Sequence, residues 1–235
     1  FKKKALKNKL KIISFGKKNK ANIMLTKTRK NKNKYLFINF NGKKIKFVIN
    51  KNLEIYKDNL LASLAVISNF FDLEILNKNF FNNFNLPEGR GDLSIVKIKK
   101  KKFNLIDESY NSNPLSLKFA IDKFSILDSK NKKKILLLGD MLELGKYSKK
   151  LHSKAAKIIN KADIDKTFVY GKQIIYTFNK IRPQIKGKVL NSKKDILNFL
   201  VNDIKNGDYL MIKGSNSTGL NTISKNLKLG NLSAL

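Results

Sequence analysis

The second half of the chain alternates short apolar runs with longer amphipathic segments. The apolar runs predict strands at residues 103–106, 134–138, 166–170, 188–190 and 209–212. Apolar residues at helical spacing predict helices at residues 114–127, 148–161, 173–180, 193–204 and 218–227. Such alternation of strands and helices indicates a Rossmann-like α/β domain with a mostly parallel sheet.

In the first half of the chain, the apolar residues mostly recur at every second position, a shorter spacing than that of a helix. Alternating apolar residues predict strands at residues 11–15, 21–28, 35–40 and 44–49, and Asn41-Gly42 is a strong hairpin signal. Helical spacing predicts a helix over residues 53–71 and a shorter one over residues 73–81. Residues 87–91, Pro-Glu-Gly-Arg-Gly, interrupt the apolar pattern. A strand is predicted after them at residues 93–98, followed by an exposed turn at 99–102. The pattern therefore predicts two domains, residues 1–88 and residues 89–235.

Three polar loops of the second half directly follow predicted strands, at residues 107–114, 139–145 and 213–217. The carboxyl ends of parallel strands form the ligand crevice of an open α/β sheet, so we expect these loops to converge on one edge. Asn113 has the side chain of a helix N-cap, and Pro114 suits the first helical position. Each loop taken alone also fits an ordinary polar connection.

Composition narrows the class of protein. The chain has 235 residues, of which 42% are hydrophobic, which is enough for one good core or two modest ones. It has no cysteine, which excludes a disulfide framework, a thiolate nucleophile and a cysteine-based metal site. No apolar run approaches the roughly 20 residues of a membrane span. The first residue, Phe1, is not Met, and we expect either a processed chain or a fragment.

The net charge of +33 is typical of a nucleic-acid-binding protein. Only three basic residues are arginines, Arg29, Arg90 and Arg182, whereas base recognition favours arginine over lysine. The lysines also run through every predicted element, and we favour a drift towards AT-rich codons as their cause. Sequence-independent binding of polyanions follows from the charge alone. A basic nucleic-acid-binding module stays as an alternative.

The polar loops resemble motifs of the Mur ligase family. Residues 107–114, Asp-Glu-Ser-Tyr-Asn-Ser-Asn-Pro, resemble the Asp-Asp-Ser-Tyr-Asn-Ala-Asn-Pro signature of the D-Ala-D-Ala-adding branch. Residues 139–145, Gly-Asp-Met-Leu-Glu-Leu-Gly, are the most specific match. Lys213-Gly-Ser resembles the family's Lys-Gly-Ser-Arg segment, with Asn216 in place of arginine. In the first half, residues 14–16, 59–65 and 89–91 are similar to a Thr-Phe-Gly strand, an adenine-binding helix start and an interdomain hinge.

This resemblance implies a function. Members of the D-Ala-D-Ala-adding branch ligate D-Ala-D-Ala to the UDP-MurNAc-tripeptide through an acyl phosphate, a cytoplasmic step of peptidoglycan biosynthesis, and we expect a monomer. Residues 1–88 would be the end of a central ATP-binding domain, and residues 89–235 the C-terminal domain. ATP and Mg²⁺ are the implied cofactors. The chain has no Gly-x-x-x-x-Gly-Lys-Ser/Thr loop, so we expect the phosphate and metal ligands upstream of Phe1 and a chain that is inactive alone.

The resemblance also implies site residues. For the nucleotide these are Asn59 at the adenine, Arg90 at the phosphates and Glu108 at the ribose. For the incoming dipeptide they are Ser109, Asn111, Asn113, Lys213 and Ser215. No metal ligand and no catalytic residue is assigned in this chain.

Several of these residues have structural alternatives. Asn59 fits a helix cap, Arg90 a solvated hinge charge, and Lys213 a surface lysine. We expect Asp140 to brace its own turn and His152 to be structural.

The sequence departs from the family at two places. Ile55 and Tyr56 stand where His and Asn are usual, and Glu108 is one methylene longer than the family's Asp. Tolerated variation and relaxed selection both explain these differences. Another ligase of the Mur and folylpolyglutamate synthase superfamily, with a single amino acid as acceptor, stays as an alternative enzyme.

Overall fold

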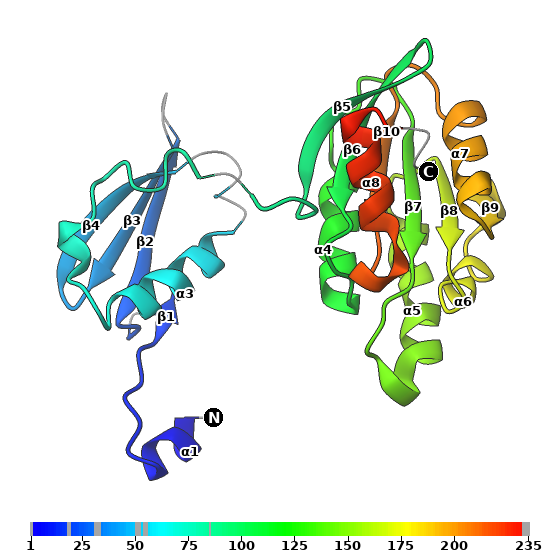
Figure 1. The fold of residues 1–235 in the computed structure, drawn as a ribbon. Helices are drawn as coiled ribbons and strands as arrows, with labels where there is room; N and C mark the ends of the chain where they lie inside the picture. The colour runs from blue at the N-terminus through cyan, green and yellow to red at the C-terminus, as the bar shows by residue number, and fades with distance from the viewer. Residues whose placement is uncertain are drawn as a thin grey trace. The chain divides into compact units, whose positions relative to one another are not determined.

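The computed structural model describes residues 2–17, 20–30, 34–49, 53, 56–84 and 86–231. The chain divides into two compact units, Phe1–Asn85 and Leu86–Leu235 (Figure 1). No helix in the described residues is long and apolar enough to cross a membrane.

The first unit contains a four-stranded sheet in the order β1-β2-β3-β4. Its strands are β1 (Phe15–Gly16), β2 (Ile23–Lys30), β3 (Lys34–Phe40) and β4 (Lys43–Ile49). β1 and β2 are parallel, and the other pairs are antiparallel. Helix α3 (Lys57–Ile67) shares a core with the sheet, while the short helix α1 (Lys2–Lys7) was not predicted. Asn41 and Gly42 both have positive φ, of 50° and 89°, which confirms the hairpin turn between β3 and β4.

Three predictions for the first unit are wrong or too long. The strand expected at residues 11–15 is reduced to β1, and α3 is shorter than residues 53–71. The helix expected at residues 73–81 is a single 3₁₀ turn, η1 (Leu73–Ile75), followed by turns. Asp72 and Asn77 explain this result, because each side chain accepts a hydrogen bond from the backbone N–H two residues later. Such local bonds compete with helix formation.

The second unit contains a six-stranded sheet in the order β5-β6-β10-β7-β8-β9 (Figure 1). Its strands are β5 (Asp92–Ile98), β6 (Lys101–Glu108), β7 (Lys134–Gly139), β8 (Lys166–Tyr170), β9 (Lys186–Leu190) and β10 (Tyr209–Lys213). β5 is an antiparallel edge strand, and the other five are parallel. All five strands predicted after residue 100 are present, so the predicted α/β fold is confirmed. β6 starts earlier than predicted, which shortens the expected turn to Lys99 and Lys100.

Helices cover both faces of this sheet. They are α4 (Pro114–Ser125), α5 (Ser148–Lys161), α6 (Ile175–Phe178), α7 (Lys193–Asn202) and α8 (Leu220–Leu229). Alternate side chains of β7 divide between two cores, with Leu136 and Leu138 packing against α4 and α5. Ile135 and Leu137 pack on the other side with α7 and α8. α6 is shorter than predicted, and α8 begins after η4 (Asn216–Thr218) and a Gly219 with positive φ.

The strand order places the polar loops together. The chain leaves β6 for β7, and β10 later returns to lie between these two strands. Lys213 at the end of β10 is therefore in register with Glu108 of β6 and Leu138 of β7. The carboxyl ends of β6, β10 and β7 are adjacent, which is where doubly wound sheets bind ligands.

Candidate functional site

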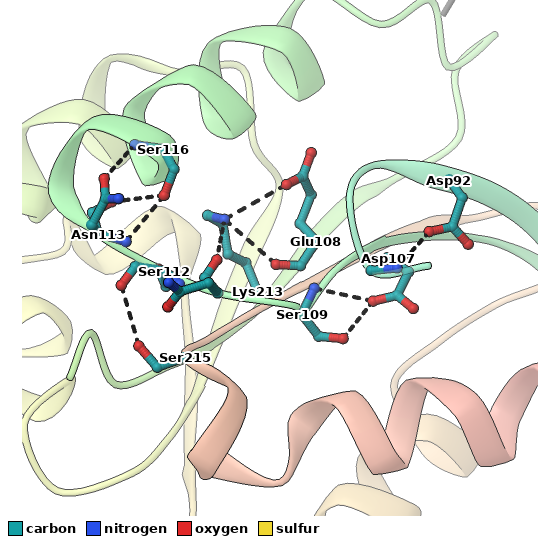
Figure 2. Close-up of polar contacts among 11 residues, drawn as sticks. Asp92, Asp107, Glu108, Ser109, Ser112, Asn113, Ser116, Lys213 and Ser215 are labelled. Carbon is teal, nitrogen blue, oxygen red and sulfur yellow. Dashed lines mark hydrogen bonds and ion pairs between the residues drawn. The ribbon is translucent and has the colours of Figure 1, made fainter. Parts of the chain in front are cut away.

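The three polar loops converge, as predicted, and Ser215 joins them. Its backbone N–H donates to the Asp140 carbonyl (2.9 Å). Its hydroxyl accepts a hydrogen bond from the Leu142 N–H (2.9 Å) and donates to the Ser112 carbonyl (3.2 Å; Figure 2). One buried serine thus connects the loops that follow β6, β7 and β10.

Two glycines allow these loops to approach closely. A Cβ atom on Gly214 would lie 2.9 Å from Thr218 Oγ1 and 3.2 Å from the Gly139 Cα atom. A Cβ atom on Gly139 would lie 2.7 Å from Leu220 Cδ1. A side chain at either position would force Thr218, Leu220 or the facing backbone to shift, so glycine at both positions fits the close packing of β7 and β10 at the site.

Lys213 is buried beneath the loop that follows β6, with only 1% of its surface exposed. Its Nζ donates to the Asn111 carbonyl (3.0 Å) and the Glu108 carbonyl (3.4 Å), and lies 3.6 Å from Glu108 Oε2 (Figure 2). Burial lowers the pKa of Lys213, and Glu108 opposes that shift. Burial raises the pKa of Glu108, and Lys213 opposes that shift. The surface alternative for Lys213 is therefore wrong.

Arg90 lies at the same corner of the unit. Its guanidinium carbon is 4.1 Å from the centre of the Tyr110 ring, a cation–π contact. The Tyr110 N–H donates to the Gly89 carbonyl (3.1 Å), which holds the two segments together. Arg90 is exposed but stacked, and its charge contributes to lowering the pKa of Lys213. The structure thus brings Arg90, Glu108 and Lys213 together.

Asp107 and Ser109 are buried, and they form hydrogen bonds and ion pairs within the second unit. The Asp107 Oδ1 atom accepts hydrogen bonds from the Ser109 N–H (3.0 Å) and hydroxyl (2.5 Å). Lys228 of α8 lies 2.6 Å from Asp107 Oδ2 and 2.5 Å from Asp92 Oδ2. Burial alone would raise the pKa of Asp107, but the bonds from Lys228 and Ser109 outweigh it and hold the pKa below its usual value. These contacts attach α8 to β5 and β6.

The two asparagines of the same loop differ in their contacts. Asn113 is the N-cap of α4, as expected, because its Oδ1 accepts from the Ser116 N–H (2.9 Å) and Ser116 Oγ accepts from the Asn113 N–H (3.0 Å; Figure 2). Asn111 is exposed, and its Oδ1 accepts from the Ser112 N–H (2.7 Å). Its amide NH₂ donates no hydrogen bond within the described part of the chain, so this group is available to a ligand.

Asp140 and His152 are structural. Asp140 braces the loop after β8, not its own turn, because its carboxylate accepts from the N–H groups of Lys172 (3.1 Å), Gln173 (2.9 Å) and Ile174 (2.7 Å). His152 is fully buried, and its Nε2 accepts from the Met141 N–H (3.0 Å). The ring proton is therefore on Nδ1, which lies 2.9 Å from the Ser148 carbonyl.

Asn59 is exposed in the first turn of α3, and its carbonyl accepts from the Ser63 hydroxyl (3.1 Å). The N-cap position of α3 belongs to Tyr56, so the alternative that Asn59 caps this helix is wrong. Asn59 lies in the first unit, whereas all other predicted site residues lie in the second. Ile55, at which the sequence departs from the family, lies outside the described residues.

A pocket of about 460 Å³ opens at the same edge of the sheet, within the usual range for small-molecule sites. It is lined by Asp140, Leu142, Tyr170, Gly171, Lys172, Ile175, Leu190, Asn191, Ser217 and Thr218. Sequence reasoning assigned no role to Lys172, Asn191, Ser217 or Thr218. A signal was present, because Lys172 lies two residues after the predicted strand at residues 166–170, and Asn191 directly follows the one at residues 188–190.

The residues present fit only part of the implied cofactor set. Arg90 offers a cation for phosphate oxygens, and Glu108 offers a carboxyl group for a ribose hydroxyl. Among the residues that the structure describes, no group of three His, Asp or Glu side chains gathers in a way that could hold a metal ion.

Residues 93–216 match the family described as Mur ligase, glutamate ligase domain. A curated Bacillus subtilis protein named UDP-N-acetylmuramoyl-tripeptide–D-alanyl-D-alanine ligase is 33% identical over 127 residues, 53% of this chain and 28% of that protein. The Buchnera aphidicola (subsp. Acyrthosiphon pisum) protein of the same name is 31% identical over 175 residues, 72% of this chain and 36% of that protein. The chain thus matches about a third of the length of these relatives.

Solved structures show the same fold. MurF ligase from Thermotoga maritima, determined in complex with ADP, has a TM-score of 0.68 at 17% identity, over 99% of this chain and 51% of that one. MurF from Acinetobacter baumannii has a TM-score of 0.70 at 19% identity, over 94% of this chain and 48% of that one. The family match covers more than half of the sequence and includes the ends of β6, β7 and β10, so this chain belongs to the Mur ligase family.

Proposed function

We propose that this chain is part of an ATP-dependent ligase that joins D-Ala-D-Ala to the UDP-MurNAc-tripeptide in the cytoplasm, in peptidoglycan precursor synthesis. The curated relatives bear the name of that ligase. The observation that carries the proposal is the convergence of the loops after β6, β7 and β10, connected through Ser215. These are the three loops whose sequences resemble the D-Ala-D-Ala-adding branch.

The reaction transfers the γ-phosphoryl group of ATP to the tripeptide's terminal carboxylate, giving ADP and an acyl phosphate. The amine of D-Ala-D-Ala attacks the acyl carbon, inorganic phosphate leaves, and the amine loses a proton. We assign Asn59 to the adenine, Arg90 to the phosphates and Glu108 to the ribose. The stacking of Arg90 on Tyr110 supports its role, because it fixes the direction of the guanidinium group.

The dipeptide assignments divide into two kinds. Ser109, Lys213 and Ser215 have their polar atoms bonded inside the unit, so we propose that they hold the loops in position. Asn111 and Asn113 are exposed, and Asn111 has a free amide group to offer.

We propose that the dipeptide's terminal carboxylate enters the neighbouring pocket. The Lys172 ammonium group and the Ser217 hydroxyl line this pocket and are suited to bind a carboxylate, whereas the Thr218 hydroxyl donates to the Ser215 carbonyl (2.6 Å).

The test joins the full 235-residue chain to the N-terminal portion of the Bacillus subtilis relative, which supplies the part that this chain does not match. We expect ADP release that requires both UDP-MurNAc-tripeptide and D-Ala-D-Ala, with the amide product identified by mass spectrometry. Lys172→Ala should raise KM for D-Ala-D-Ala more than KM for ATP, whereas Lys225→Ala, an exposed lysine on α8, is the matched control. A chimera that uses a single amino acid and rejects the dipeptide would support the other superfamily ligases instead.

A further inference from the structure

A groove along helix α5 carries a concentration of positive charge that the ligase function does not use. It has a volume of about 770 Å³ and is lined by nine residues of α5 and its neighbours. Six of the nine are lysines, Lys146, Lys149, Lys150, Lys154, Lys157 and Lys180, and none is acidic. Helix α5, which carries most of these lysines, packs with α4 on one side of the sheet (Figure 1).

The charge of this groove is not neutralised by the protein. None of its six lysines forms an ion pair with another described residue, whereas Lys43, Lys118, Lys134, Lys213 and Lys228 all do. Lys146 and Lys149 instead lie over the rings of Tyr147 (5.4 Å) and Tyr176 (5.3 Å). Like charges this close attract counterions, and their release favours the binding of a polyanion.

The lysines are arranged in a row. Lys150 and Lys154 are four residues apart on α5, so they are separated by about 6 Å along its axis, and Lys157 lies about 4.5 Å farther along. Lys146 precedes them in the 3₁₀ turn η2 (Gly145–Tyr147), directly before α5. A small anion neutralises one or two of these charges, but a chain of regularly spaced phosphates can neutralise all of them at once.

We propose that this groove binds single-stranded nucleic acid through its phosphates, without reading the base sequence. Such sites combine a basic groove with aromatic rings on which bases stack. Tyr147, 56% exposed, and the half-buried Tyr176 lie beside the lysines and offer these rings. Lysine suits sequence-independent phosphate contacts, because it acts as a point charge. A membrane surface fits less well, because no lining residue is a large aliphatic side chain that could enter a bilayer.

The test compares two triple variants of equal charge. The first, Lys150→Glu/Lys154→Glu/Lys157→Glu, reverses charge in the groove. The control, Lys100→Glu/Lys193→Glu/Lys194→Glu, makes the same change in net charge at exposed lysines of the β5–β6 turn and the first turn of α7, which packs on the other face of the sheet. Binding of a fluorescently labelled oligouridylate to the full chain is measured by anisotropy over a series of potassium chloride concentrations.

We expect the groove variant to lose affinity about ten-fold or more, and the slope of log K against log salt to become shallower by up to about two, since each lost phosphate contact removes about 0.7. The control variant should lose much less affinity and keep its slope. Lys150→Arg/Lys154→Arg/Lys157→Arg should retain binding, which separates loss of charge from loss of fold.

Three results would overturn the proposal. Equal losses in the two glutamate variants would mean that the overall charge of the chain, not the groove, attracts the oligonucleotide. Failure of the wild-type chain to bind it would exclude the site. Vesicles containing phosphatidylglycerol that bind through the three groove lysines, with the oligonucleotide unaffected by the same substitutions, would assign the groove to a membrane surface. None of these results depends on ligase activity.

Discussion

Replacing Lys213 with methionine tests whether the buried Lys213–Glu108 pair holds the candidate site together. The substitution keeps much of the side-chain volume but removes the donor to the Asn111 and Glu108 carbonyls. It also leaves the Glu108 side chain, 12% exposed, without the ammonium group 3.6 Å from its carboxylate. Breaking a buried pair by removing one partner costs about 3–5 kcal/mol, and we expect a loss near the lower limit because Glu108 keeps some solvent contact.

The pH dependence makes this prediction specific to the pair. Burial already raises the pKa of Glu108, and loss of Lys213 removes an opposing effect, so the pKa should rise further. Below its unfolded pKa, Glu108 is protonated in both the folded and the unfolded state and adds no penalty. As pH rises through the unfolded pKa towards the folded one, only the unfolded state loses the proton, so the folded state loses stability. The Lys213→Met defect should therefore be smaller in acid, where only the loss of the donor to the Asn111 and Glu108 carbonyls remains, and reach its full size above the folded pKa of Glu108.

The assay is urea unfolding of the full chain at a series of pH values, with hydrogen exchange in β7 and β10 assigning the transition to the second unit. Lys225→Met, at an exposed position of α8, is the control and should change the free energy of unfolding by less than about 0.5 kcal/mol. Adding Glu108→Gln to Lys213→Met should recover part of the loss and remove its pH dependence. A loss below about 1 kcal/mol at neutral pH, or no recovery in the double variant, would refute the buried-pair account.

Three further predictions concern the same unit and the chain as a whole. Asn113→Ala should destabilise the second unit by about 1 kcal/mol in urea unfolding, since it removes the N-cap of α4, whereas Asn113→Ser should restore most of the loss. Lys228→Met should remove stability that is present above the unfolded pKa of Asp107 and disappears as pH falls through its lowered folded pKa; a pH-independent defect would contradict this linkage. The purified chain alone should show no Mg-dependent ATP hydrolysis above a heat-denatured control, because its sequence has no phosphate-binding loop, and measurable turnover would contradict that expectation.

The sequence predicted the second unit well because its signals are local. The strand predicted at residues 134–138, with its apolar run at residues 135–138, is buried on both faces, and Asn113-Pro114 has the chemistry of a helix start. The helix predicted at residues 73–81 was wrong, also for a local reason. The side chains of Asp72 and Asn77 accept hydrogen bonds from backbone N–H groups two residues later, which competes with helix formation. The partners of Asp140 could not be predicted, because the three N–H groups that it binds belong to the loop after the next strand.

Some residues of the family motifs hold the loops of the site in place and do not face a ligand. Ser109, Lys213 and Ser215 matched the family and were assigned to substrate, yet each forms hydrogen bonds that hold the loops in place. A sequence motif therefore does not separate a residue that touches a ligand from one that fixes the loop presenting it. Burial makes the distinction, because Lys213 and Ser215 are nearly inaccessible while Asn111, Arg90 and Lys172 are exposed. Substitutions of the first group should act mainly on stability, and those of the second group on KM.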